Sequence, residues 1–228
     1  MNRWLFRSFS KYKAWCWPRH FSIVTSNAID SLTAFRRAEE YRGKLAVRKL
    51  RDQGCVPAVL EGDLKQSVPI WIDADPLMKV ARSPFFKYRL VNLSIDGETM
   101  LVLPTEMMTL GVPSPVSIQH VTFTRWPSDP VLRPFKFNFR LRVINEEKCP
   151  QVKIGGYVHD MFSRNGVPFM LTRPDFPPFL TVDMAKADKG DIRLEHVELP
   201  EGARVVPTPQ TLQNGGNFLL VRAHRIRG

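Results

Sequence analysis

The sequence predicts a mainly β fold, and three features of the chain carry that prediction. The 228 residues include 19 prolines and 13 glycines, a proportion that favours many short strands and turns over a helix bundle. Asp96-Gly97 lies between two apolar runs, which is the pattern of a β-hairpin with its preferred turn. Apolar and polar residues alternate from 135 to 143, the period of a strand with one buried face.

The first half of the chain is predicted to contain two short helices among strands. Residues 45–54 predict a helix that ends at Gly54. Asp75 and Pro76 are residue types of a helix N-cap and a first helical position, and they predict a second helix that ends near Arg82. We expect strands at 56–60, 68–72 and 116–126, and a hairpin over 88–103.

Segment 127–134, PSDPVLRP, is the predicted domain boundary because it holds three prolines in eight residues. Asn214 to Asn217 should turn a final hairpin that returns residues 218–221 as a strand. Further strands are expected at 157–162, 167–172, 179–184 and 192–199. The predicted organisation is an arm over 1–29, a first domain over 30–126, a linker over 127–134 and a C-terminal domain with a basic tail over 135–228.

Positive charge is concentrated at the two ends of the chain. The formal net charge is +11, yet no acid precedes Asp30 and none follows residue 201. A nearly neutral body between two cationic ends favours a polyanion such as nucleic acid as the partner. The alternative is a solvated tail together with a targeting segment. The end cations assigned to RNA are Arg3, Arg7, Lys11, Lys13, Arg222, Arg225 and Arg227.

Residues 1–26 predict that the protein is targeted to mitochondria. The segment contains arginine, serine and aromatic residues without any acid, which is typical of a mitochondrial presequence. We therefore expect the protein in the mitochondrial matrix, on the mitochondrial ribosome. If the segment stays on the mature chain, Trp4, Trp15 and Trp17 could stack on bases or pack into protein grooves.

No pattern in the sequence indicates catalysis, a metal or a cofactor. Cys16, Cys55 and Cys149 are scattered and odd in number, so they predict neither a disulfide framework nor a paired-cysteine zinc site. The glycines at 155 and 156 lack the Walker spacing. We expect no catalytic residue, no metal ligand, no cofactor and no small-molecule substrate. No run of eighteen apolar residues predicts a transmembrane helix.

Two acid-containing pairs have a structural interpretation that we favour over a catalytic one. His159 and Asp160 are neighbours on a predicted strand, where adjacent side chains point to opposite faces and cannot act on one substrate atom. Asp183 and Asp191 are expected at a strand end and a turn, although the sequence also allows a pair of carboxylates.

Two stretches point to a particular family. The first is 48–62, RKLRDQGCVPAVLEG, and the second is 145–156, NEEKCPQVKIGG. Segments 117–123, 179–183, 189–192 and 199–202 complete the pattern. In order and spacing these segments resemble the bacterial large-subunit ribosomal protein L-twenty-five family, in its long two-domain form, also called general stress protein CTC. The resemblance covers residues 30–205.

The resemblance implies an N-terminal β-barrel with short helices that binds 5S rRNA in the central protuberance of the large subunit. It also implies a second, mostly antiparallel β domain beside the barrel. Carried over residue by residue, Arg48 and Lys49 contact RNA, and Gln119 and His120 match the family's Gln-His pair, whose histidine meets the RNA.

The spacing of the helical cations supports this assignment. Lys44, Arg48 and Arg51 share a helix face and could span adjacent phosphates, while Leu50 should face the barrel core. A solvated basic helix face and an ordinary structural His120 are the alternatives.

The chain departs from the family pattern at three places. Glu61 replaces a usual tyrosine, Thr122 replaces a usual aspartate, and an expected basic residue falls near Glu39 or Glu40. An acid facing phosphates is unfavourable, and losing the aromatic ring removes a stacking group. We therefore expect an organellar member whose partner RNA, 5S rRNA or its replacement, is altered or absent, with the basic arms and neighbouring proteins taking over the docking.

The leading expectation is a structural constituent of the mitochondrial large ribosomal subunit, with rRNA and neighbouring ribosomal proteins as partners. One alternative is a tRNA-interacting module, since the barrel type resembles the anticodon-binding part of glutaminyl-tRNA synthetase. A free stress or interaction protein is the other alternative.

Overall fold

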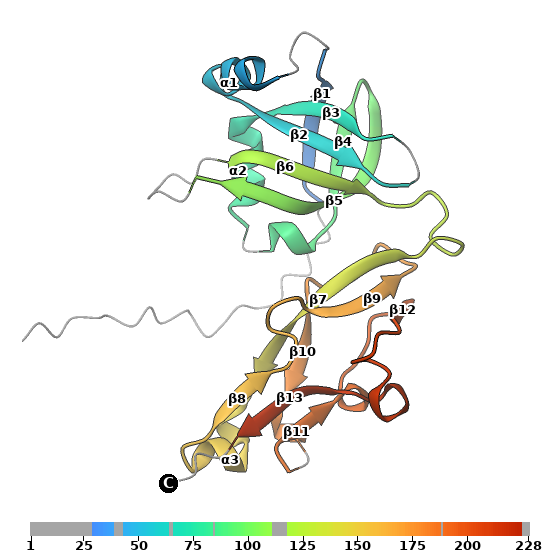
Figure 1. The fold of residues 1–228 in the computed structure, drawn as a ribbon. Coiled ribbons are helices and arrows are strands. Elements are labelled where there is room, and N and C mark those ends of the chain that lie inside the picture. The colour runs from blue at the N-terminus through green and yellow to red at the C-terminus, as the bar shows by residue number, and fades with distance from the viewer. Residues whose placement is uncertain are drawn as a thin grey trace, which may run out of the picture.

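A computed structural model describes residues 29–38, 43–63, 66–83, 85–110, 118–187 and 189–224 (Figure 1). Strands dominate these residues, which confirms the predicted fold class. A closed barrel forms the upper body in Figure 1, and a four-stranded and a three-stranded sheet lie below it. We call these two sheets and their connections the second lobe.

The barrel closes without a free edge because its first strand pairs with two partners. Strand β1 (Ser31–Arg36) runs antiparallel to β3 and parallel to β4, which completes the order β1-β3-β2-β6-β5-β4. Closure leaves no unpaired strand edge exposed to other chains. The other strands are β2 (Cys55–Glu61), β3 (Val68–Asp73), β4 (Val91–Ile95), β5 (Glu98–Thr109) and β6 (Ile118–Arg125). The helical elements are α1 (Lys44–Asp52), α2 (Ala74–Ala81) and η2 (Phe86–Tyr88).

Buried and outward-facing side chains alternate along the barrel strands, and the predicted β4–β5 turn is present. Inward residues such as Leu32, Ile70 and Phe123 are buried, with their strand neighbours facing outward. The β4–β5 hairpin turns at Asp96 and Gly97 as expected, and both have positive φ, 52° and 88°. The sequence analysis did not predict strand β1, although buried and exposed residues alternate over its first four positions.

The predicted start of the second helix at Asp75 is wrong. Asp73 still pairs with Cys55 in the β2–β3 ladder, so the chain leaves the sheet only at residue 74. The Ala74 N–H donates to the Gly54 carbonyl at 2.9 Å, which fixes the turn from strand to helix. Helix α2 therefore begins at Ala74, and Pro76 lies in the first turn, where its missing N–H breaks no helical bond.

The second lobe is mostly antiparallel, as expected. Its four-stranded sheet has the order β10-β7-β9-β12, in which only the β10–β7 pair is parallel. Its three-stranded sheet has the order β11-β13-β8. The strands are β7 (Phe135–Ile144), β8 (Tyr157–Asp160), β9 (Val167–Leu171), β10 (Phe179–Asp183), β11 (Asp191–Arg193), β12 (Ala203–Val205) and β13 (Leu219–His224). The helical elements are η3 (Glu146–Lys148), α3 (Pro150–Lys153), η4 (Met184–Lys186), η5 (Leu194–His196) and η6 (Gln213–Gly216).

Strand β7 confirms the period-two prediction. Phe135, Phe137 and Phe139 are buried and alternate with exposed side chains. Phe137 and Phe139 lie edge to face with ring centroids 4.7 Å apart, and Phe139 meets Phe169 of β9 in the same way at 5.3 Å. This aromatic cluster forms the centre of the lobe's core.

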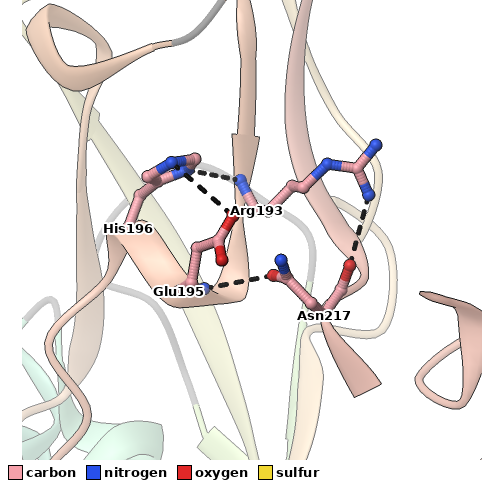
Figure 2. A network of polar contacts seen from close by, with 4 residues as sticks. All are labelled: Arg193, Glu195, His196 and Asn217. Atoms are coloured by element: carbon pink, nitrogen blue, oxygen red, sulfur yellow. Dashed lines mark hydrogen bonds and ion pairs between the residues drawn. The ribbon is translucent and has the colours of Figure 1, made fainter. Parts of the chain in front are cut away.

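The strand predicted over 192–199 is wrong beyond Arg193, where η5 begins. Figure 2 shows the side chains that turn the chain. The Arg193 N–H donates to Nδ1 of His196 at 3.1 Å, and the Glu195 N–H donates to Oδ1 of Asn217 at 3.3 Å. The Arg193 guanidinium also donates to the Asn217 carbonyl at 3.2 Å. Side chains thus satisfy backbone groups that a longer strand would have paired with a neighbouring strand.

The prediction of a final hairpin turned by residues 214–217 is also wrong. Strand β13 pairs with β11 and β8, whereas the strand before it in sequence, β12, pairs with β9 in the other sheet. Residues 213–216 form η6, so the segment joins two sheets instead of turning one hairpin. Local turn residues gave no information about which distant strand would be the partner.

The barrel and the second lobe are packed against each other. Leu90 and Leu103 of the barrel belong to the same buried cluster as the core of the second lobe. The Arg140 Nε–H donates to the Tyr88 hydroxyl at 3.3 Å, and Phe85 lies 5.3 Å from Phe179, centroid to centroid. The barrel therefore has one end covered, and RNA would have to approach other faces.

Candidate RNA-binding interface

Helix α1 presents cations to solvent from the side of the barrel. Lys44, Arg48 and Lys49 are exposed, whereas Leu50 is buried with 3% exposure, although it is not part of the buried cluster of the barrel core that the sequence predicts it to face. The helix packs against β2, the strand that follows it. Within the part of the chain that the structure describes, Lys44, Arg48 and Lys49 form no ion pair. Their charge is therefore available to an external anion.

Arg51 joins the two stretches that the sequence analysis assigned to RNA. Its Nε and Nη2 donate to the carbonyl oxygen of Gln119 at 3.2 and 3.0 Å. This contact crosses from the end of α1 to the start of β6, over 68 residues of sequence. The cationic helix and the Gln119-His120 pair therefore lie side by side on one surface. The side chain of Arg51 holds them together through its bonds to the Gln119 carbonyl.

The imidazole of His120 is fixed in orientation at this surface. Its Nδ1 lies 3.0 Å from the Pro57 carbonyl, and its Nε2 lies 3.4 Å from the Thr122 hydroxyl. A carbonyl oxygen only accepts, so Nδ1 carries a proton and donates it to Pro57. In the neutral ring Nε2 then accepts from Thr122. Thr122, one of the departures from the family pattern, thus supplies an uncharged partner.

Sequence reasoning missed a buried arginine at the other end of β6 from this surface. Arg125, at the end of β6, is only 8% exposed, and its Nη1 donates to the Gly62 carbonyl at 3.2 Å. Burial lowers the pKa of Arg125, while the nearby Asp63 carboxylate opposes that effect. Gly62 has φ +95°, and a Cβ there would lie 3.0 Å from the Thr124 side chain, so the turn after Glu61 favours glycine.

Comparison with known proteins assigns the chain to a family. A model of the Ribosomal L25p family matches residues 32–123. The large ribosomal subunit protein bL25 of Dichelobacter nodosus is 33% identical over 172 residues, covering 73% of this chain and 72% of the relative. The protein of the same name from Chelativorans is 30% identical over 174 residues, covering 75% and 78%. This chain belongs to the Ribosomal L25p family.

The L25p match includes both parts of the candidate interface, because residues 32–123 contain α1 and most of β6. The protein bL25 of Zymomonas mobilis is 28% identical over 177 residues, covering 77% of each chain. Coverage of that size extends beyond the barrel into the second lobe, as the long form of the family requires. Family membership places the chain among the structural proteins of the large ribosomal subunit, which are not enzymes.

The other cations assigned to RNA lie apart from this interface or outside the described residues. Arg222 is on β13 of the second lobe, where Nε and Nη2 donate to both carboxylate oxygens of Asp191 at 2.8 and 2.9 Å. Hydrogen bonding to Arg222 lowers the pKa of Asp191, and the same bond raises the pKa of Arg222. Arg3, Arg7, Lys11, Lys13, Arg225 and Arg227 lie outside the described residues, as does the predicted presequence over 1–26.

Asp160 and Asp183 hold local hydrogen bonds in the second lobe of this L25p family member. Asp160 accepts from the Phe162 N–H at 2.7 Å, and burial raises the pKa of Asp160. Asp183 accepts from the side-chain amide of Asn145 at 2.7 Å, a bond that lowers the pKa of Asp183. His159 is exposed while Asp160 is half-buried, so the two side chains do not share a face, as predicted.

The described residues contain no group of three or more metal-ligating side chains. Among the helices that the structure describes, none is long and apolar enough to cross a membrane. Cys55 and Cys149 are both free thiols, and burial is the main cause that raises the pKa of Cys55.

Proposed function

We propose that this chain binds rRNA through α1 and the start of β6, as a structural constituent of the mitochondrial large ribosomal subunit. The observation that carries the proposal is the pair of hydrogen bonds from Arg51 to the Gln119 carbonyl. These bonds place the exposed cations of α1 beside the oriented imidazole of His120. Phosphate contacts would fix the position of the chain on RNA, and His120 would contact the sugars or bases between those phosphates.

The proposal includes a division of labour within the chain. Residues 30–126 would bind rRNA, 5S rRNA or its replacement, at the central protuberance. Segment 127–134 would link this domain to residues 135–228, which would contact neighbouring ribosomal proteins. The acid-free composition of residues 1–26 supports a mitochondrial location. Cations at both ends of the chain would add further phosphate contacts.

A charge-removal experiment tests the RNA contact. In the full chain, Arg48→Ala combined with Lys49→Ala should weaken binding to 5S rRNA by about 1–3 kcal/mol and reduce its salt dependence, because two phosphate contacts are lost. The matched control is Lys79→Ala with Arg82→Ala, which removes the same charge from the end of α2. Equal affinities of the two double variants would place the contact elsewhere on the chain.

Sedimentation tests the assembly itself. The full chain should migrate with the large subunit through a sucrose gradient at low salt and should be released at high salt, as phosphate contacts exchange for counterions. Failure to co-migrate at any salt concentration would contradict the proposal and favour a free protein. Residues 1–26 fused to a fluorescent reporter should direct it to mitochondria, and a cytosolic reporter would contradict the mitochondrial location.

A further inference from the structure

An outward-facing row of side chains crosses the barrel beside the candidate interface. Phe35 of β1 is the register partner of Trp71 of β3, and Trp71 is the partner of Pro57 of β2. The parallel β2–β6 register, in which Ala58 meets Val121, sets Pro57 beside His120. His120 in turn pairs with Met108 of β5. We call Phe35, Trp71, Pro57, His120 and Met108 the outer row.

The outer row faces away from the barrel core because strand neighbours point to opposite faces. Its members' neighbours in sequence are buried in the core, namely Ala34, Ile72, Ala58 and Val121. Within the row, Phe35 is 40% exposed and Met108 is 64% exposed. The rings of Phe35 and Trp71 are stacked, with centroids 4.4 Å apart and an interplanar angle of 23°. Trp71 and His120 are half-buried and Pro57 is buried, so the row offers to solvent the stacked rings at one end and Met108 at the other.

The charges around the outer row differ at its two ends. At the His120 end, Arg51 bonds the carbonyl of the preceding residue, which brings the cationic helix α1 to the row. At the Phe35 end, Arg36 is paired with Asp96 at 2.6 Å. Three strand spacings separate Phe35 from His120, about 14 Å in all. A ligand that suits this surface carries flat rings and anionic groups a short distance apart, which describes a nucleotide chain.

We propose that the stacked rings of Phe35 and Trp71 hold an unpaired base of rRNA, while α1 holds the phosphates next to it. This inference rests on the proposed function and adds the kind of RNA feature that the site selects. Aromatic side chains stack on any base, and only an unpaired base has a face free for stacking. A paired helix would still meet the cations of α1 but would not reach the rings, so the rings supply preference for unpaired RNA.

The test compares two RNA hairpins that differ by one unpaired nucleotide. One hairpin carries a bulged 5-iodouridine and the other is fully paired, and both are titrated with the full chain. Wild type should bind the bulged hairpin about tenfold more tightly, as one base stack allows. Phe35→Leu and Trp71→Leu should abolish that preference and leave affinity for the paired hairpin unchanged. Ultraviolet irradiation should crosslink the iodouridine to Phe35 or Trp71, as located by mass spectrometry.

A matched control and a fold check keep the result interpretable. Tyr157 of the second lobe is 56% exposed and stacks on His224, so Tyr157→Leu removes a comparable ring far from α1 and should not alter the preference. Phe35 is exposed enough that its substitution by leucine should retain the fold, which circular dichroism checks.

The outcomes separate this inference from the proposed function. The inference alone is overturned if Arg48→Ala with Lys49→Ala weakens both hairpins while Phe35→Leu keeps the preference for the bulge. A crosslink that maps away from the outer row has the same consequence. The row contacts a protein instead if Phe35→Leu weakens large-subunit association without changing RNA preference. Binding to neither hairpin nor to 5S rRNA overturns both proposals.

Discussion

The barrel and the second lobe use their cations in different ways. On the barrel, Lys44, Arg48 and Lys49 project from α1 without an ion pair among the described residues. In the second lobe, Arg222 is held by Asp191, and Arg173 is paired with Glu201. The barrel also has ion pairs, Arg36 with Asp96 and Arg89 with Asp30, so both bodies neutralise part of their charge and the cations of α1 differ from the rest. The proposal that the barrel contacts RNA therefore depends on the cations of α1 and not on the charge of the whole barrel.

The two bodies also differ in how the backbone hydrogen bonds at the edges and ends of their sheets are satisfied. The barrel ends its sheet by closing on itself, through the parallel β1–β4 pair. The second lobe has open sheets, and side chains such as His196 and Asn217 take over backbone hydrogen bonds at their ends (Figure 2). Its stability should consequently depend on single side chains and tight turns more than the barrel's does.

The largest expected effect is on the second lobe, from Gly156→Ala. A Cβ at this position would lie 2.2 Å from the His224 carbonyl oxygen and 2.5 Å from that of Gln151, so backbone must move. We expect a loss of about 3 kcal/mol in the free energy of unfolding, measured by urea denaturation. Gly54→Ala is the control, because φ there is +80° but no atom lies within 4 Å, and it should cost about 1 kcal/mol. Similar losses would contradict the steric argument.

The next effect concerns the attachment of α1 to the barrel. Leu50→Ala should lower the free energy of unfolding by about 2–3 kcal/mol, because the side chain is 3% exposed. It should also weaken 5S rRNA binding, since the cations of α1 lose their fixed position. Leu45→Ala is the matched control, because Leu45 is on the same helix and 76% exposed. If both variants bound RNA like wild type, positioning of α1 would not matter for the interface.

A smaller effect is expected where side chains end the open sheet. Asn217→Ala removes the acceptor of the Glu195 N–H and should cost about 1 kcal/mol. Asn138→Ala, an exposed position on β7, should leave stability unchanged in the same denaturation experiment. If Asn217→Ala left the free energy of unfolding unchanged, η5 would form without this bond. The contrast between the two bodies would then be weaker.

The smallest effect depends on pH. Asp191→Asn should lower stability by about 1 kcal/mol at neutral pH, because a two-point contact with Arg222 is lost. The folded chain lowers the pKa of Asp191, so this stabilisation is complete above the unfolded pKa of about 4 and is lost as pH falls through the folded pKa. The difference between wild type and variant should therefore shrink in acid, as thermal denaturation at several pH values would show.

The control for that pH dependence is another carboxylate of the second lobe. Glu201 pairs with Arg173, but its side chain is 81% exposed, so Glu201→Gln should have little effect at any pH. A constant difference for Asp191→Asn from neutral pH into acid would contradict the role assigned to its ion pair.

Much of the candidate site could be predicted from sequence because it depends on local chemistry. Residues 44–51 form a helix with cations on an exposed side and Leu50 buried, as their spacing predicts. The outer row could not be found in this way, because Phe35, Trp71 and His120 are distant in sequence and become neighbours only through strand register. Asp75 failed as a helix start because pairing of Asp73 in the sheet decided where the strand ended.

The sequence by itself determined many of the strands but not β1 or β12, and it determined where Asp96-Gly97 turns the chain and which helix carries the cations. These features depend on residues within a few positions of one another, through side-chain periodicity and backbone preference. Tertiary structure alone decided that β13 joins β11 and β8, that β1 closes the barrel, and that Arg51 reaches Gln119. Such choices depend on hydrogen bonds and packing between distant segments, whose partners local patterns do not specify.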